Sequence, residues 1–138
     1  MTSWSVDANS HDQELRRRLT PEQYRVTQRG GTEPAFNNAF HDHHADGVYH
    51  CVVCEEPLFA SDDKYDSGTG WPSFSAPIGS GQVDNHVERK WLVTFVENRC
   101  SNCGAHLGHV FADGTSPSNA RHCINSASLT FKPSQPSC

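Results

Sequence analysis

Residues 48–54 read VYHCVVC, a short β-branched and aromatic run that closes on two cysteines, Cys51 and Cys54. A second pair with the same C-x-x-C spacing, Cys100 and Cys103, lies in CSNC. Two such units, each at a strand end or a tight turn, can bring four thiolates to one tetrahedral Zn²⁺. The sequence therefore predicts strands that end in metal-binding turns.

A site with four cysteine ligands is closed, so its metal stabilises the fold and has no open position for catalysis. We expect one structural Zn²⁺ per chain. It would matter here, because apolar residues make up only 35% of the chain and the core is modest. Disulfides, or buried and redox-active thiols, are the alternatives for the same four cysteines.

Further runs of β-branched and aromatic residues lie at 89–100 and 128–132, and Gly, Pro, Asn and Asp separate them. In RKWLVTFVENRC, at 89–100, Trp91 and Val93 alternate with Leu92 and Thr94. We interpret this stretch as one strand, a candidate for the centre of a sheet. The pattern predicts a mainly antiparallel β domain with short helices in its first third.

Two short helices are predicted before the strands. Residues 12–19 form the first, and its basic run, Arg16–Arg18, is interpreted as a solvated face. The second begins at Thr20 as N-cap, with Pro21 in the first turn and Gln23 completing a capping box.

The 138 residues suggest one domain, which we place at 12–132, between a flexible N-terminus at 1–11 and a flexible tail at 133–138. A net charge of −5 argues against nucleic-acid binding. No apolar stretch is long enough to span a membrane, and the N-terminus does not resemble a signal peptide. We expect a monomeric cytoplasmic protein.

Cys123, in RHCINSAS, has no neighbour at metal or disulfide spacing. Arg121 and Asn125 point to its side of a strand, and His106 and His109 lie shortly upstream. A guanidinium, an amide and imidazoles are the setting that lowers the pKa of a cysteine and makes a nucleophilic thiolate. An inert core thiol is the alternative.

Two other stretches carry unusual side chains. In SGTGWPSF, at 67–74, a turn-rich backbone surrounds Trp71, which either lines a ligand surface or caps the core. HDHHADGVYH, at 41–50, holds four histidines, for which a solvated loop is favoured over a metal site.

The motifs GWPSF, AHLGHVF and RHCINSAS, with the two C-x-x-C pairs, resemble those of the methionine-R-sulfoxide reductase B (MsrB) family. LTPEQYRVTQRGGTEPAF and GVYHCVVCEEPLF are similar to its N-terminal part, so the resemblance runs from about Leu19 to Phe131. It implies a fold of two packed, curved antiparallel sheets, the MsrB-like β-tent, with short N-terminal helices. It also implies thiol-dependent reduction of methionine-R-sulfoxide, free or in proteins, with regeneration by thioredoxin or another thiol.

The resemblance also implies a role for each site residue. Cys123 matches the nucleophile, which would become a sulfenic acid. The polar set around the sulfoxide oxygen matches His106, His109 and Asn125. Substrate-binding positions match Trp71, Phe111 and Arg121, with the indole against the substrate methyl. The zinc ligands match Cys51, Cys54, Cys100 and Cys103.

The sequence departs from the family at Thr69, where many members carry the cysteine that resolves the sulfenic acid. Cys138 is then a possible resolving thiol, and an external thiol is the other route. Two other classes of function fit the sequence less well. A zinc-ribbon-like binding module has no use for an activated thiol, and a Cys-His hydrolase would need an oxyanion-hole motif that we do not find.

Overall fold

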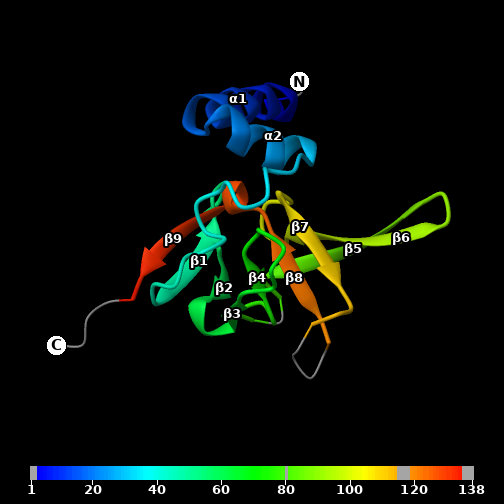
Figure 1. Ribbon diagram of the computed structural model, residues 1–138. Coiled ribbons are helices and arrows are strands. Elements are labelled where there is room, and N and C mark those ends of the chain that lie inside the picture. The colour runs from blue at the N-terminus through cyan, green and yellow to red at the C-terminus, as the bar shows by residue number, and fades with distance from the viewer. Residues whose placement is uncertain (1–2, 80, 115–118, 135–138) are drawn as a thin grey trace.

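The chain folds into two antiparallel sheets, with two helices gathered at one end (Figure 1). The computed structural model describes residues 3–79, 81–114 and 119–134. In order, the elements are α1 (Ser3–Arg18), α2 (Pro21–Arg29), β1 (Gly47–Cys51), β2 (Pro57–Ala60), η1 (Ser61–Asp63), β3 (Lys64–Tyr65), β4 (Ser73–Phe74), β5 (Val83–Lys90), β6 (Val93–Cys100), β7 (His106–Phe111), β8 (Arg121–Ile124), η2 (Ser126–Ser128) and β9 (Leu129–Pro133).

The smaller sheet has the order β2-β1-β9 and the larger one β3-β4-β8-β7-β6-β5. Every strand pair is antiparallel, and the pairing of β1 with β9 joins the first strand to the last. Residues from both sheets share one core, in which the rings of Phe59 and Phe74 stack at 4.5 Å. Tyr49 is fully buried beside Phe74. The predicted mainly β fold with two antiparallel sheets is confirmed.

The interpretation of residues 89–100 as a single strand is wrong. The stretch turns back on itself, and Lys90 pairs with Val93 across a two-residue turn formed by Trp91 and Leu92. Trp91 has a φ of 59°, a left-handed conformation that bulky residues rarely adopt. The alternation of apolar residues continues through this turn, so periodicity alone did not reveal it. Of the resulting strands, β6 lies inside the larger sheet and β5 forms its edge.

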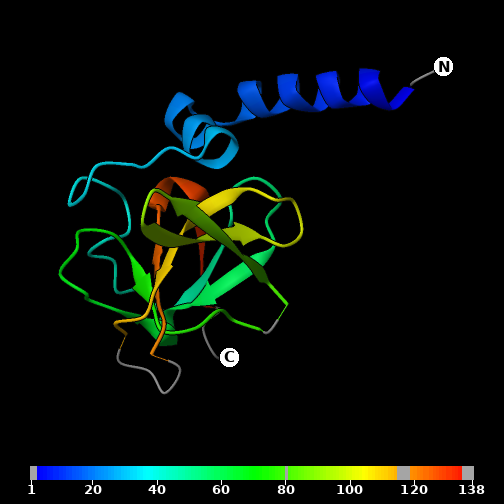
Figure 2. The ribbon, with the colours of Figure 1, turned by 90° about the vertical axis from the view of Figure 1, so that its right-hand side faces the viewer.

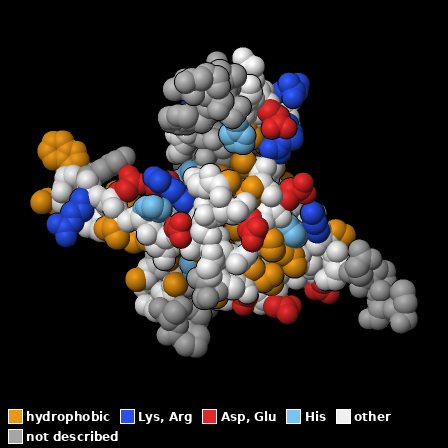
Figure 3. Space-filling model, turned by 180° about the vertical axis from the view of Figure 1, so that it is seen from behind, with side chains coloured by type: hydrophobic (Ala, Val, Ile, Leu, Met, Phe, Trp, Pro, Cys, Tyr) orange, Lys and Arg blue, Asp and Glu red, His pale blue; other side chains and the backbone are white. Residues whose placement is uncertain are grey.

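The β5–β6 hairpin projects from the body, and hydrophobic side chains gather on it in the view from behind (Figure 3). Trp91 is 99% exposed and Leu92 is completely exposed at the turn. Val87, Val93 and Phe95 are also exposed along the same hairpin. The body of the domain therefore leaves the outer half of these two strands uncovered.

The helices cover the end of the sheets, and α1 extends beyond them (Figure 2). Helix α1 begins at Ser3, earlier than the helix expected at 12–19. The predicted capping box of α2 is confirmed: the backbone N–H of Gln23 donates to Thr20 Oγ1 over 3.1 Å, and the backbone N–H of Thr20 donates to Gln23 Oε1 over 2.9 Å. Neither helix of the described residues has the length and hydropathy of a membrane-spanning segment.

The arginine run is more than a solvated face. Arg16 forms an exposed ion pair with Asp12 at 2.9 Å, as a solvated face would. Arg18 instead donates to the backbone oxygens of Val52 and Val53, at 3.2 and 2.9 Å. These two residues lie between the cysteines of the first C-x-x-C pair, so α1 supports the turn that carries that pair.

Candidate active site and metal centre

The four paired cysteines converge at one point. Cys51 ends β1, Cys100 ends β6, and their partners follow in tight turns. The four sulfur atoms all lie within 4.8 Å of one another, with Cys51 and Cys103 at 3.6 Å and Cys54 and Cys100 at 3.6 Å. The predicted convergence is confirmed, and it joins the smaller sheet to the larger one.

The spacing fits a tetrahedral metal. Thiolates bound at about 2.3 Å to a tetrahedral Zn²⁺ lie about 3.8 Å apart, close to the separations found here. Hydrogen bonds with Cys100 and Cys103, together with burial, raise the pKa of Cys51 when no cation is bound. A divalent cation would remove this conflict, since it favours the thiolate forms of all four cysteines. The donor set could therefore hold a metal ion.

The histidines of 41–50 do not converge in this way. His43 packs its ring 4.4 Å from that of Phe131 and lies 2.6 Å from the Tyr49 hydroxyl. His44 pairs with Asp42 at the surface. Among the described residues, the four cysteines are the group placed to share a metal. His41, His43 and His44 lie in a loop, with His43 in the aromatic packing, whereas His50 lies on β1.

A second site surrounds Cys123, which lies on β8 directly opposite Ser73 of β4 and His109 of β7. A cavity of about 220 Å³ opens beside it. Residues predicted from the sequence make up much of the lining: Trp71, His109, Phe111, Arg121, Cys123 and Asn125. Thr32 and Thr69 line it as well. Thr32 comes from the loop after α2 and Trp71 from the loop before β4, so these two loops, β7 and β8 build this cavity.

The electrostatic setting of Cys123 differs from the one expected. Burial raises the pKa of the Cys123 thiol, while the charge of Arg121 and hydrogen bonds with Thr69 and Arg121 act to lower it. Arg121 is itself held by Asp113 through two contacts at 2.8 and 3.2 Å, and its guanidinium lies 4.5 Å from the centre of the Phe111 ring. Burial prevails over these effects, so the pKa of the Cys123 thiol lies above its ordinary value.

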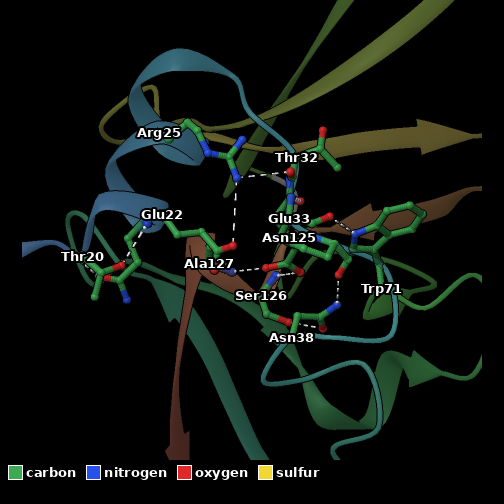
Figure 4. Close-up of polar contacts among 12 residues, drawn as sticks. Thr20, Glu22, Arg25, Thr32, Glu33, Asn38, Trp71, Asn125, Ser126 and Ala127 are labelled. Carbon is green, nitrogen blue, oxygen red and sulfur yellow. Dashed lines mark hydrogen bonds and ion pairs between the residues drawn. The ribbon is translucent and has the colours of Figure 1, made fainter.

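Sequence reasoning missed Glu33, which organises the floor of the site (Figure 4). Its carboxylate is buried and accepts the backbone N–H groups of Ser126 and Ala127 at the start of η2, at 2.5 and 2.7 Å. Its backbone oxygen accepts the Trp71 indole N–H at 3.0 Å. Its backbone N–H donates to Asn125 Oδ1 at 3.1 Å. One residue thus positions both the indole and the amide of the cavity.

Both polar atoms of the Asn125 side chain form hydrogen bonds with the backbone around the cavity. Besides accepting from Glu33, the side chain donates through Nδ2 to the backbone oxygen of Leu107 at 3.0 Å. Nearby, Asn38 donates to the backbone oxygen of Gly70 at 2.9 Å and accepts from Ser126 Oγ at 2.7 Å (Figure 4). The loop that precedes β1 is therefore fastened to both segments that border the cavity.

His106 is the predicted residue that lies outside the Cys123 cavity. It lines a neighbouring cavity of about 760 Å³ together with Glu97, Arg99 and residues of α2. His109 and Phe111 line both cavities, and the rings of His106 and His109 are 5.5 Å apart. His106 therefore neighbours the Cys123 cavity through its ring contact with His109. Cys138, the possible resolving thiol, lies outside the described residues.

Comparison with known proteins follows this geometry. The SelR domain family matches residues 19–133, which include both sites. Peptide methionine sulfoxide reductase MsrB of Thioalkalivibrio sulfidiphilus is 50% identical over 121 residues, covering 88% of each chain. MsrB of Methylibium petroleiphilum is 52% identical over 120 residues, covering 87% of each chain.

A mammalian relative shows the same similarity. Methionine-R-sulfoxide reductase B3, mitochondrial, of Mus musculus is 52% identical over 125 residues, which are 91% of this chain and 49% of the mouse protein. The similarity therefore extends to a mouse protein, and the family match covers α2, both sheets and both cysteine sites. By family match and by relatives aligned over most of its length, this chain belongs to the SelR-domain family of MsrB methionine sulfoxide reductases.

Proposed function

We propose that this protein reduces methionine-R-sulfoxide to methionine at Cys123, with a thiol as the source of electrons. The observation that carries the proposal is the shared cavity, in which a lone cysteine meets an indole and an imidazole. A sulfoxide offers an electrophilic sulfur, a basic oxygen and an apolar methyl group. Cys123, His109 and Trp71 supply a nucleophile, a polar group and an apolar surface for these three features.

The reaction begins when the Cys123 thiolate attacks the sulfoxide sulfur. His109 polarises and protonates the oxygen, and His106 supports it from the adjoining cavity. The oxygen is transferred to Cys123, so that thiolate, sulfoxide and one proton yield a sulfenic acid and methionine. Two thiols, from thioredoxin or a small thiol, then return Cys123 to the reduced state and release a disulfide and water.

Substrate orientation follows from the walls of the cavity. Trp71 would hold the methyl group, with Phe111 and Arg121 shaping the remainder. The indole is fixed by its hydrogen bond to Glu33 and cannot turn away without losing that bond. An apolar wall and a polar wall on opposite sides of the sulfur distinguish the two epimers, and we assign the R epimer as substrate.

We assign one Zn²⁺ to Cys51, Cys54, Cys100 and Cys103. When bound, it supplies a closed, structural cross-link between the two sheets. The spacing of the four sulfur atoms, all within 4.8 Å of one another, supports this assignment. The metal takes no part in the chemistry at Cys123.

The test is direct. The purified protein is incubated with dithiothreitol and either the R or the S epimer of a methionine sulfoxide peptide, and methionine is quantified by mass spectrometry. The R epimer should be consumed and the S epimer should remain. Reduction of both at similar rates, or of neither, would contradict the proposal.

A further inference from the structure

Beside Cys123 lies a chain of three hydroxyl groups that the reaction above does not use. Thr69 lines the same cavity as Cys123, and its hydroxyl acts on the thiol as a hydrogen-bond partner that lowers the pKa of Cys123. Thr69 Oγ1 is 2.9 Å from Ser67 Oγ, which is 2.7 Å from Ser73 Oγ. Ser73 in turn donates to the backbone oxygen of Trp71 over 3.3 Å. The series runs from the sulfur into the protein interior.

The fold places both end residues of this series, Thr69 and Ser73, next to Cys123. Ser73 is fully buried and pairs with Cys123 across β4 and β8, which places their side chains on one face of the sheet. Gly68 and Gly70 have φ of 78° and 91°, and a Cβ on Gly70 would lie 2.6 Å from the Phe36 ring. The turn they form returns Thr69 to the sulfur.

Counting protons shows how the series behaves with a neutral thiol. Each hydroxyl has one proton to donate and lone pairs to accept. The last bond is fixed, because the Trp71 carbonyl can only accept. Ser73 therefore accepts from Ser67, Ser67 accepts from Thr69, and Thr69 accepts from the Cys123 thiol. Every proton in the series then has an acceptor.

When the Cys123 thiol loses its proton to solvent, the sulfur needs a hydrogen-bond donor, because a thiolate can only accept. If all three hydroxyls turn, Ser73 donates to Ser67, Ser67 donates to Thr69, and Thr69 donates to the Cys123 sulfur. The only bond given up is the 3.3 Å contact between Ser73 and the Trp71 oxygen, which is longer than the two bonds between the hydroxyls. The bond gained is charge-assisted, which is the stronger kind.

We propose that Thr69, Ser67 and Ser73 form a hydroxyl relay that reorients to stabilise the thiolate of Cys123. The proposal rests on the proposed function only in taking Cys123 as the nucleophile. It gives Thr69 a task at the position where the family resemblance implies a resolving cysteine. The Thr69 side chain acts before the attack on the sulfoxide.

Other groups also act on the thiol and must be held constant in a test. Arg121 lies on the same strand, His109 faces it from β7, Tyr65 reaches it from β3, and the Glu33 carboxylate lies below. A change confined to a hydroxyl leaves all four in place. Thr69→Val is such a change, because valine keeps the branched shape and removes only the hydroxyl.

The experiment measures the rate at which iodoacetamide alkylates Cys123 as a function of pH, in the zinc-loaded protein, with peptide mass spectrometry resolving Cys123 from the other cysteines. A hydrogen bond to the thiolate favours the charged form, so Thr69→Val should raise the apparent pKa of Cys123 by about one unit or more. Thr69→Ser should restore the parent value. Ser67→Ala should give a smaller rise, since Thr69 can still donate.

Thr94→Val, on the projecting hairpin, is the matched control and should not move the pKa. An unchanged pKa in Thr69→Val, or a parent-like value in Ser67→Ala, would overturn the relay. Alkylation needs no sulfoxide, so the two proposals fail separately. A protein that does not reduce methionine-R-sulfoxide but shows the Thr69→Val shift would refute the proposed function and retain the relay.

Discussion

His106 Nδ1 lies 2.6 Å from Oε2 of Glu97, and both side chains are only 7% exposed. Arg99 holds the other carboxylate oxygen of Glu97 at 2.8 Å. The carboxylate therefore fixes the proton of His106 on Nδ1. His106 Nε2 is buried and has no hydrogen-bond partner among the described residues, so it is the ring atom left for a ligand or water in the larger cavity.

This pairing predicts a specific loss of stability in acid. Burial acts to raise the pKa of Glu97, but hydrogen bonds from Arg99 and His106 outweigh it and lower the pKa to about 2. Because the folded value is below the ordinary 4.5, ionised Glu97 stabilises the fold above about pH 4.5, and this contribution disappears as the pH falls through about 2.

Glu97→Gln should therefore be less stable than the parent at pH 7, and the difference should shrink as the pH falls from about 4.5 to 2. Urea unfolding at a series of pH values measures it. Glu22→Gln, at an exposed carboxylate, is the control and should track the parent. A gap that stays constant across this range would show that Glu97 acts through packing alone.

Cys123→Ser should abolish sulfoxide reduction and leave the fold intact, because serine keeps the size of the side chain and removes the nucleophile. Single-turnover methionine formation and circular dichroism provide the two measurements. Cys138→Ser should not alter the single turnover, since any resolving step comes later. Retention of even a tenth of the activity in Cys123→Ser would identify another cysteine as the nucleophile.

Loss of one metal ligand should be costly. Cys100→Ser removes a buried sulfur at the junction of the two sheets, and we expect the free energy of unfolding to fall by about 3 kcal/mol or more. Elemental analysis of the parent should find one zinc per chain. Active protein that contains no metal, or a Cys100→Ser variant with unchanged thermal stability, would count against the structural zinc.

Thr69→Cys should create a resolving thiol. Thr69 already hydrogen-bonds to Cys123, so the two side chains are in reach of each other, and a disulfide requires Cα atoms within about 7 Å. After one turnover without reductant, the variant should form a disulfide between position 69 and Cys123. In the parent, dimedone should trap Cys123 as sulfenic acid. A quantitative Cys123–Cys138 disulfide in the parent would show that the tail resolves it instead.

Glu33→Gln should weaken both the fold and substrate binding. The amide can accept from only one of Ser126 and Ala127 and turns an N–H toward the other, which costs about 1–3 kcal/mol. The Trp71 indole, held by the backbone of Glu33, would be less well placed. Urea unfolding and the KM for the R sulfoxide should both change, whereas Glu22→Gln should change neither. An unchanged KM in Glu33→Gln would show that the Glu33 carboxylate is not needed to position the Trp71 indole.

Local signals were enough to predict much of this structure. The C-x-x-C pairs, the capping box at Thr20 and the strands at 48–53 and 128–132 each depend on residues close together in the chain. The hairpin at 89–100 was missed because its turn is made by Trp91 and Leu92, with no glycine or asparagine to mark it. An alternating pattern that runs through such a turn is indistinguishable from one long strand.

Contacts between distant segments were beyond sequence reasoning. Glu33 lies in a loop, and its partners Ser126 and Ala127 are 93 and 94 residues away. The thiol of Cys123 was expected to have a low pKa, but the counter-charge of Asp113 on Arg121 and the depth of burial depend on tertiary packing. His106 was expected at the sulfoxide, and Glu97 holds it in the next cavity.

The pairing of Gly47 with Pro133 has a consequence for biosynthesis. During translation, β1 emerges early and remains without its β9 neighbour until nearly all of the described chain has been made. Contacts between such distant segments form late, because the intervening loop must be closed first. Cys123 leaves the ribosome only shortly before β9, and until then its strand partner Ser73 can pair only with Tyr65 of β3. A nascent chain thus carries no assembled thiol site, and nucleophilic reactivity arrives together with the closed fold.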